Sequence, residues 1–405
     1  RLPLAQLAQP AIDYARHGFP VSPTIATLWT LGAERLGTQP GFAECFLPDG
    51  RPPRAGELFR SEAHAGTLED IVATEGESFY RGALAARMAA HARACGGAMT
   101  EDDLGAHQAD WVGTLSQRFG DSVVHEIPPN GQGIAALMAL GMLQHFDLAA
   151  LPVDGTASQH LQIEAMKLAF ADVYAHVADA AAMRLTAADL LDAGYLAERA
   201  RSIDPRRAQA HASGRAPRGG TIYLTAADER GMMVSFIQSN YMGFGSGVVV
   251  PGWGLSLQNR GHCFTLQADH PNVVAPGKRP FHTIIPAFVT RDGQPVMSYG
   301  VMGGNMQPQG HLQTLVRMLD YRQHPQAACD APRWRFNAGL SVNIEPHMPA
   351  ATIAGLQALG HEVGDIHDSY QDFGAGQFIW RLGDPAVEGY VAASDPRRDG
   401  AAVGY

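Results

Sequence analysis

The spacing of apolar residues changes near Gly219, and this change constrains the fold more than any other feature of the chain. Before it, residues 1–210 are expected to be mostly helical, beginning with an apolar stripe from Leu4 to Tyr14 that ends at a glycine stop, Gly18. After it, short β-branched or aromatic runs such as TIYLTAAD, MMVSFIQSN and PVMSYGV alternate with turn residues. A helical half followed by a strand-rich half predicts sheets covered by helices, an α+β or sandwich fold.

Further helices are expected on both sides of this change. The segment HLQIEAMKLAFADVYAHVAD, residues 160–179, has apolar residues at helical spacing, with Glu164 and Lys167 largely off that stripe. Within the strand-rich half, helices are expected at about 309–321 and 349–359. These segments would supply layers that cover the sheets.

Composition and charge favour a folded protein that acts on a small molecule. The chain has 405 residues, of which 46% are hydrophobic, and this is enough for a sizeable core. The net charge of −10 argues against nucleic acid or an anionic membrane as a partner, because both reward clustered positive charge. No apolar run reaches the roughly 20 residues of a membrane span.

Neither a metal nor a cofactor is expected. The four cysteines lie far apart with no CxxC, which argues against a zinc knuckle or a redox dithiol and fits a reducing compartment. His145, His160 and His176 lack the spacing of metal ligands. The GFGSG motif follows no βα unit, so it is not a dinucleotide fingerprint.

The start of the chain bears on the compartment. Its first residues lack the pattern of a secretory signal, which favours a cytoplasmic protein. The chain begins with Arg1 rather than Met, so we expect further residues to precede it. A periplasmic location stays open, because a signal could lie in those residues.

Thr221 is a candidate nucleophile. A threonine hydroxyl is weak at neutral pH and needs a base, and the threonine's own α-amine can serve once the bond before it has been cut. Gly219-Gly220-Thr221 suits such self-cleavage, because glycine permits a strained backbone. The loop AQAHASGRAPRGG is then a processing segment, although its composition also fits a flexible linker.

Gly303 and Gly304 are candidates for an oxyanion hole. They lie between an expected strand and an expected helix, where adjacent backbone N–H groups can point into a cleft and hold a developing negative charge. The alternative is a plain strand-to-helix turn, since glycines often serve only to allow a backbone conformation that other residues disfavour.

Landmark motifs run along nearly the whole chain. Upstream of Thr221 they are HGFPVSP, SFYRG, PPNGQG and EAMKLAFAD; from Thr221 onward they are TIYLTAADERG, FIQSNYMGFGSG, LQNRG, PGKRPFHTIIPAF, GVMGGNMQPQGH, DAPRW and ASDPRRDGAAVGY. In this order they resemble the large-subunit and small-subunit landmarks of the γ-glutamyltransferase family of N-terminal nucleophile hydrolases.

The resemblance implies a four-layer αββα sandwich that cuts itself between Gly220 and Thr221. The fragments 1–220 and 221–405 would then form one structural domain, a heterodimer that could dimerise further. Thr221 would form an acyl-enzyme, with its freed amine as base and Ser239 orienting its hydroxyl. The backbone amides of Gly303 and Gly304 would stabilise the oxyanion.

The candidate substrate-binding residues depart from the family pattern. Tyr241, Arg260 and Cys263 stand where the family holds the substrate's ammonium group, and His282-Thr283 replaces a serine pair that grips its carboxylate. Asn259, next to Arg260, is also assigned to substrate binding. A cation in place of a carboxylate favours an acidic acyl group without that amine, such as glutaryl or oxalyl.

Other interpretations stay open at this point. Arg260 could turn outward or pair with a structural acid. The chain could be a γ-glutamyl or glutathione hydrolase with a rearranged pocket. It could also be a silent, unprocessed member of the family that serves as a binding protein.

Overall fold

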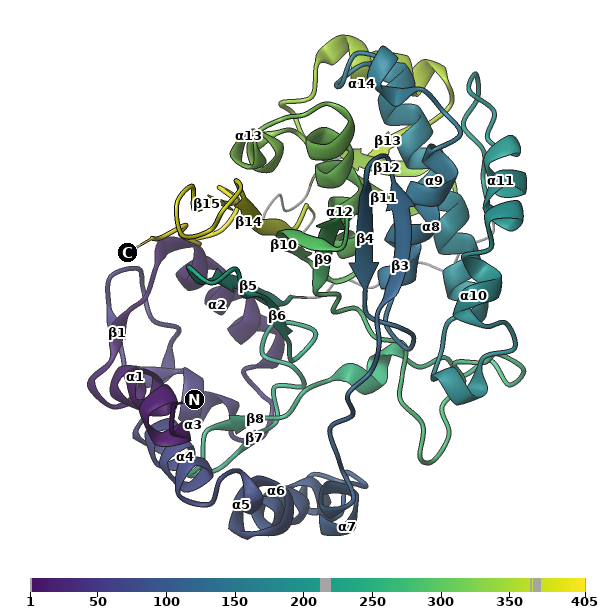
Figure 1. The fold of residues 1–405 in the computed structure, drawn as a ribbon. Coiled ribbons are helices and arrows are strands. Elements are labelled where there is room, and N and C mark those ends of the chain that lie inside the picture. Colours follow the sequence, from purple (N-terminus) through teal and green to yellow (C-terminus); the bar gives the residue numbers. More distant parts are fainter. Residues whose placement is uncertain (1, 212–219, 365, 367–372, 405) are drawn as a thin grey trace. The chain divides into compact units, whose positions relative to one another are not determined.

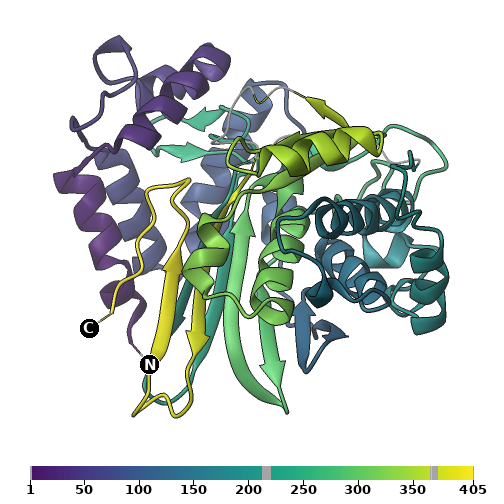
Figure 2. The ribbon, with the colours of Figure 1, turned by 90° about the horizontal axis from the view of Figure 1, so that it is seen from above.

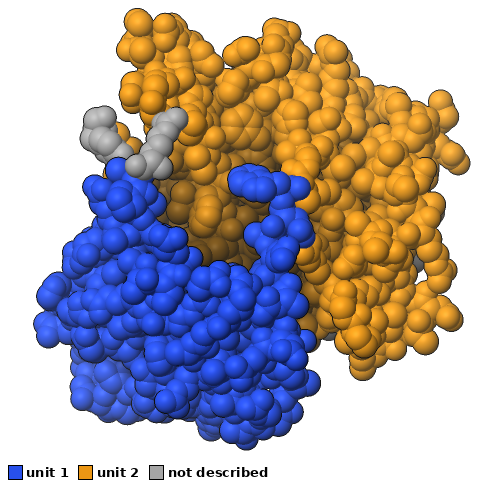
Figure 3. All heavy atoms as spheres, turned by 60° about the horizontal axis from the view of Figure 1, so that its bottom comes forward, with its two compact units in different colours: residues 1–111, 242–259 blue, residues 112–241, 260–405 orange. Residues whose placement is uncertain are grey.

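The computed structural model describes residues 2–211, 220–364, 366 and 373–404. Contacts divide the chain into two compact units, coloured separately in Figure 3: unit 1 is Arg1–Trp111 with Met242–Asn259, and unit 2 is Val112–Tyr241 with Arg260–Tyr405. Both expected fragments, 1–220 and 221–405, therefore contribute residues to each unit.

Unit 1 is mostly helical, as expected for the first part of the chain. Trp29 lies at the centre of its core, where its ring packs against Phe59 and Phe244 and its Nε1 donates a hydrogen bond to the Phe46 carbonyl at 2.8 Å. The elements of this unit are α1 Leu4–His17, β1 Phe19–Pro20, α2 Pro23–Leu36, α3 Phe42–Phe46, β2 Leu58–Phe59, α4 Glu62–Ala73, α5 Glu77–Arg81, α6 Ala83–Ala94, α7 Glu101–Gly105, β7 Val249–Val250 and β8 Leu255–Ser256, with a 3-10 turn at Pro48–Gly50 (Figure 1).

Unit 2 is built on an antiparallel sheet. Among the described residues this sheet has six strands in the order β15-β14-β10-β9-β4-β3 (Figures 1 and 2). Two of them were not expected, because β3 and β4 lie in the half of the chain that reads as helical. The strands are β3 Leu115–Phe119, β4 Ser122–Glu126, β9 Ala287–Arg291, β10 Gln294–Met302, β14 Ala375–Arg381 and β15 Tyr390–Ser394.

The two faces of β10 show how unit 2 is layered. Tyr299 and Val301 point toward the helices, where Tyr299 lies against His311 and Val301 against Gly310. The intervening residue, Gly300, faces a second sheet, the hairpin of β5 Ile222–Ala227 and β6 Met233–Gln238. Helices on one face and a second sheet on the other give the α+β sandwich expected from the sequence.

The helices on the first face include α8, α12 and α13, with α9 packed behind α8. The remaining elements of unit 2 are α8 Gly133–Leu143, α9 Thr156–His176, α10 Ala187–Leu190, α11 Ala193–Arg201, α12 Gln307–Leu315, α13 Pro325–Asp330, α14 Ala350–Ala358, β11 Trp334–Ala338, β12 Ser341–Ile344 and β13 Glu362–Gly364, with 3-10 turns at Leu148–Ala150, Ala180–Ala182, Arg260–Cys263 and Gly304–Met306 and a π-helical turn at Val316–Asp320. The helices expected at 160–179, 309–321 and 349–359 are all present.

The β5–β6 hairpin fixes the direction in which Thr221 points. Ile222 pairs with Gln238, so Thr221 stands opposite Ser239 just beyond the end of the ladder. Side chains alternate along a strand, and Tyr223 is buried against Gly300 whereas Ile222 is 64% exposed. Thr221 therefore shares the inward face with Tyr223.

Helix α12 lies close to β10 and is attached to it by a buried hydrogen-bond chain. The Val301 N–H donates to His311 Nε2 at 3.0 Å, and His311 Nδ1 lies 2.7 Å from Glu126 Oε1, with both side chains fully buried. Burial raises the pKa of Glu126 well above its usual value and lowers that of His311 to about 3. A neutral pair thus joins α12 to β4 and β10.

We predict that Gly310→Ala destabilises the protein by about 1–3 kcal/mol, because overpacking a tight contact displaces its neighbours. A Cβ at this position of α12 would lie 2.5 Å from Val301 Cγ1. Gly66→Ala in α4 is the control, since a Cβ there meets nothing within 4 Å. Denaturant unfolding should show a loss for the first variant and no loss for the second; equal stability of the two would contradict the close packing of α12.

Candidate active site

The Gly220 carbonyl oxygen accepts hydrogen bonds from two hydroxyl groups. Thr221 Oγ1 lies 2.8 Å from it and Ser239 Oγ 2.7 Å from it, and the two hydroxyl oxygens are 3.3 Å apart. The Gly220 N–H donates to the Tyr241 carbonyl at 2.6 Å. Gly220, the residue before the bond predicted to be cut, is therefore held at its N–H and at its carbonyl oxygen by the chain segment that follows β6.

The backbone of Tyr241 holds both Ser239 and Gly220 by hydrogen bonds. Its φ is 80°, in the left-handed region that non-glycine residues seldom adopt, and the side chain is fully buried. Its N–H donates to Ser239 Oγ at 2.8 Å, which leaves the Ser239 hydroxyl proton directed at the Gly220 carbonyl. A strained conformation next to a reactive group is a common feature of functional sites.

The Gly303-Gly304 turn leads directly into α12. Both residues have positive φ, 136° and 59°, and a Cβ on Gly303 would lie 3.0 Å from Gly374 Cα, so the turn needs glycine. The side-chain amide of the fully buried Gln132, in the PPNGQG landmark, donates to the carbonyls of Gly304 at 2.8 Å and Thr283 at 2.7 Å. This amide ties the turn to the segment that carries His282 and Thr283.

Arg260 points inward, so the alternative of an outward arginine is wrong. Its side chain is 5% exposed, its guanidinium lies 4.5 Å from the centre of the Tyr241 ring, and its Nη1 donates to Thr283 Oγ1 at 2.7 Å. Burial lowers the pKa of Arg260 from its usual value, while the neighbouring Cys263 and Tyr241 oppose this change. The cation is thus enclosed beside an aromatic ring and a hydroxyl group.

His282 stays neutral beside this cation. Burial, together with the positive charge of Arg260, lowers the pKa of His282 to about 3. Its Nδ1 accepts a hydrogen bond from the Ile284 N–H at 3.2 Å, which leaves the proton on Nε2. His282 can therefore donate a hydrogen bond without adding charge.

The structure brings most of the expected site residues into one connected group. From Thr221 the contacts run through Ser239, Tyr241 and Arg260 to Thr283. The Gln132 amide then joins Thr283 to Gly304. Asn259 is the exception, because it belongs to unit 1, where its Oδ1 accepts a hydrogen bond from the Met242 N–H at 3.1 Å.

Sequence reasoning missed Gln307. This residue begins α12, is fully buried, and its Nε2 lies 3.3 Å from Thr221 Oγ1. It stands in the GVMGGNMQPQGH landmark, three residues after Gly304. The signal was a glutamine in the first turn of a helix that follows a glycine pair, a position from which a side chain reaches back toward the preceding turn.

One buried cluster has the residue types of a metal site. The ligand atoms of His160, Glu164 and His361 all lie within 4.8 Å of one another. Lys167 Nζ already donates to Glu164 at 2.7 Å and lies 3.4 Å from His361 Nδ1; His361 Nε2 lies 2.8 Å from His160 Nδ1, and His160 Nε2 lies 2.9 Å from the Asp204 carbonyl. We describe the cluster as a hydrogen-bonded network, because its nitrogen and oxygen atoms bond to one another, to Lys167 and to the Asp204 carbonyl.

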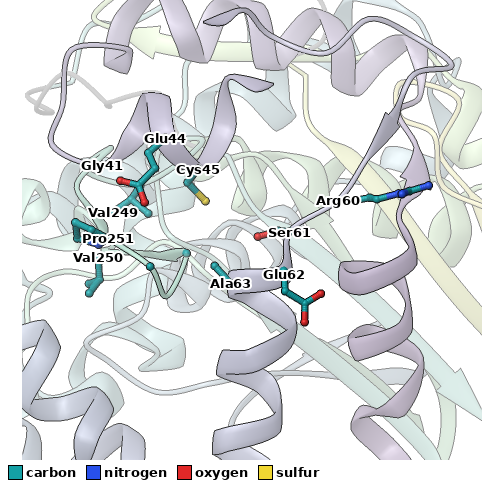
Figure 4. Close-up of a pocket in the computed structure, with 12 residues that line it drawn as sticks. Gly41, Glu44, Cys45, Arg60, Ser61, Glu62, Ala63, Val249, Val250 and Pro251 are labelled. Atoms are coloured by element: carbon teal, nitrogen blue, oxygen red, sulfur yellow. The ribbon is translucent and has the colours of Figure 1, made fainter. Parts of the chain in front are cut away.

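A pocket of about 240 Å³ lies in unit 1 and contains none of the expected site residues. Cys45 is the one cysteine among the residues that line this pocket. Burial raises the pKa of its thiol to about 11, so the thiol stays protonated at neutral pH. Figure 4 shows Arg60 extended away from Glu44 and Cys45. We therefore assign the candidate chemistry to the group around Thr221.

Comparison with known proteins identifies the family. The family model for gamma-glutamyltranspeptidase matches residues 1–405. The chain belongs to this family. The oxamate amidohydrolase proenzyme of Klebsiella pneumoniae is 38% identical over all of this chain and 76% of its own length, and the glutathione hydrolase-like YwrD proenzyme of Bacillus subtilis is 36% identical over all of this chain and 77% of its own length.

A solved structure supports the same assignment. The cephalosporin acylase from Bacillus halodurans is 44% identical and superposes with a TM-score of 0.93, covering 99% of this chain and 74% of the acylase. The expected N-terminal nucleophile hydrolase fold is thereby confirmed, and the family comprises autoprocessing amidohydrolases, acylases and gamma-glutamyltranspeptidases. None of the helices in the described part of the chain has the length and apolar character needed to cross a bilayer.

We predict that Ser239→Ala slows cleavage at Gly220–Thr221 roughly 10- to 100-fold, the effect of losing one hydrogen bond to a group that develops charge. Ser239→Thr keeps the hydroxyl and should retain most of the rate. The fraction of cut chain is measured on gels over time after synthesis. A Ser239→Ala variant that is cut as fast as the wild type would contradict this role.

Proposed function

We propose that this chain is a self-cleaving amidohydrolase with Thr221 as its nucleophile, acting on a small amide whose acyl group ends in an anion. The observation that carries the proposal is the position of the Thr221 and Ser239 hydroxyls, both within hydrogen-bonding distance of the Gly220 carbonyl oxygen. Membership of a family with several proenzymes agrees with it.

Self-cleavage would begin with attack of Thr221 Oγ1 on the Gly220 carbonyl carbon. The hydroxyl proton passes to the Thr221 nitrogen as the C–N bond breaks, and the Gly220 acyl group moves to the oxygen as an ester. The Ser239 hydroxyl stabilises the oxyanion formed on the Gly220 oxygen. Water then hydrolyses the ester and leaves a Gly220 carboxylate, a free Thr221 amine and a free hydroxyl.

Turnover would use the same oxygen. The freed amine accepts the hydroxyl proton as Oγ1 attacks the substrate amide, and the amine product leaves with that proton. The N–H groups of Gly303 and Gly304 would hold the tetrahedral oxyanion. Water then releases the acid. The fragments 1–220 and 221–405 would remain together as a heterodimer, since both contribute to unit 1 and to unit 2.

The acyl group is proposed from the charge around Arg260. A buried guanidinium that contacts Thr283 and Tyr241 favours a carboxylate and disfavours the ammonium group of a γ-glutamyl donor. His282 can donate a second hydrogen bond to that carboxylate. Glutaryl amides and oxamate have the required chemistry, and one relative is named for the hydrolysis of oxamate.

Thr221→Ala should leave the chain uncut and without amidase activity, because alanine has no hydroxyl group that could form the ester. Thr221→Ser keeps a hydroxyl and an amine, and should retain cleavage at a reduced rate. The fragments are followed on gels and turnover by release of ammonia from oxamate. Amide hydrolysis by a folded Thr221→Ala variant would refute the mechanism.

Arg260→Met should lower kcat/KM for glutaryl p-nitroanilide roughly 10- to 100-fold, since it removes the charged partner of the substrate carboxylate. Its effect on γ-glutamyl p-nitroanilide should be much smaller, and the wild type should prefer the glutaryl compound. Preference of the wild type for the γ-glutamyl compound would favour a γ-glutamyl or glutathione hydrolase instead. An uncut wild type without activity toward either would favour a silent precursor.

A further inference from the structure

Gln307 connects Thr221 to a second backbone segment. Its Oε1 accepts a hydrogen bond from the Ile285 N–H at 3.2 Å, and its Nε2 lies 3.3 Å from Thr221 Oγ1. A backbone N–H can only donate, so the oxygen of the amide must face Ile285. The NH₂ group is therefore the one that faces Thr221, and it donates to the threonine oxygen.

The hydrogen bonds around Thr221 Oγ1 are consistent with this direction. The Tyr241 N–H donates to Ser239, whose hydroxyl donates to the Gly220 carbonyl. The Thr221 hydroxyl donates toward the same carbonyl or toward Ser239, so its oxygen is left to accept from Gln307. This acceptance restricts the rotation of the hydroxyl and keeps its reactive lone pair in a defined position.

We propose that Gln307 is a catalytic residue, which donates a hydrogen bond from Nε2 to Thr221 Oγ1 during self-cleavage and acyl transfer. The inference rests on the proposed function, because Oγ1 is the atom that forms the new C–O bond in both reactions. As the hydroxyl proton leaves, negative charge develops on this oxygen, and a fixed N–H donor stabilises it. A neutral amide supplies this donor at every working pH.

Two neighbouring glutamines show what a purely structural role looks like. Gln309, two residues later on α12, is also fully buried; its Oε1 accepts from the Phe336 N–H at 2.7 Å and its Nε2 donates to the Phe336 carbonyl at 3.2 Å. Gln313 makes the same pair of bonds to Trp334. Both bind the backbone of β11, whereas Gln307 directs its donor at the nucleophile.

The test compares Gln307→Met with Gln309→Met by the rate of cleavage at Gly220–Thr221 in the full chain. Both variants lose a buried amide and leave a backbone N–H without its acceptor, so both are expected to lower stability. Only Gln307→Met should slow cleavage per folded molecule, by roughly 10- to 100-fold. Equal cleavage rates in the two variants would overturn the proposal.

The pH dependence of cleavage in Gln307→Glu distinguishes a catalytic role from a structural one. This variant retains an oxygen that accepts the hydrogen bond from the Ile285 N–H. The introduced carboxyl has a raised pKa because the site is buried, and it donates a proton to Thr221 Oγ1 only while protonated. Cleavage should therefore be slow at pH 8 and recover as the pH falls toward 5, while the wild type shows no such recovery. A rate that rises with pH, as it would if the carboxylate acted as a base, would contradict the proposal.

The experiment separates this inference from the proposed function. If the wild type is never cut at Gly220–Thr221, the proposed function fails before Gln307 is tested. If the wild type is cut and Gln307→Met is cut equally fast, the proposed function stands and the role of Gln307 falls. If Gln307→Glu does not fold, the cleavage rate of Gln307→Met relative to Gln309→Met decides the outcome.

Discussion

The register of the β5–β6 hairpin is the constraint on which the rest of the candidate site depends. Pairing of Ile222 with Gln238 sets Thr221 opposite Ser239 and brings Gly220 to the backbone of Tyr241. A slip of one residue would turn the threonine to the opposite face, because side chains alternate along a strand. The same hairpin packs on β10, whose end leads through the glycine turn to α12. Nucleophile, glycine turn and Gln307 are thus positioned by one pair of packed sheets and a single helix.

Two buried cations of unit 2, Arg260 and Lys167, lie in different surroundings. The neighbours of Arg260 include an aromatic ring, a hydroxyl and a neutral histidine, and the proposed function uses this cation to bind a substrate carboxylate. In α9, by contrast, Lys167 is paired with Glu164 inside the fold, and this pair is satisfied within the chain. The Lys167–Glu164 pair stabilises the packing of α9 only as long as both partners remain.

Local signals made part of this structure predictable from the sequence. The hairpin after Thr221, the turn at Gly303-Gly304 and the following helix were predicted, because alternation, glycines and helical spacing act over a few residues. Strands β3 and β4 were missed although they form a local hairpin with each other. Their place in the sheet depends on the pairing of β4 with β9, more than 160 residues away in the chain. The direction of Arg260 and the contact of Gln307 with Thr221 also depend on distant segments. Glu164 and Lys167 were expected off the apolar stripe of α9, and nothing in the sequence signalled that both are fully buried, where their ion pair offsets the cost of burying each charge.

The central claim is that Thr221 Oγ1 carries the acyl group during turnover. The most direct test is to mix the cut protein with glutaryl p-nitroanilide, quench it with acid within the first turnovers, and map the mass of the 221–405 fragment by peptide analysis. The account predicts that this fragment gains the mass of one glutaryl group on the peptide that begins with Thr221, and that the added mass disappears as the substrate is exhausted. Turnover with the acyl group found on another residue, or with no acyl group bound at all, would contradict it.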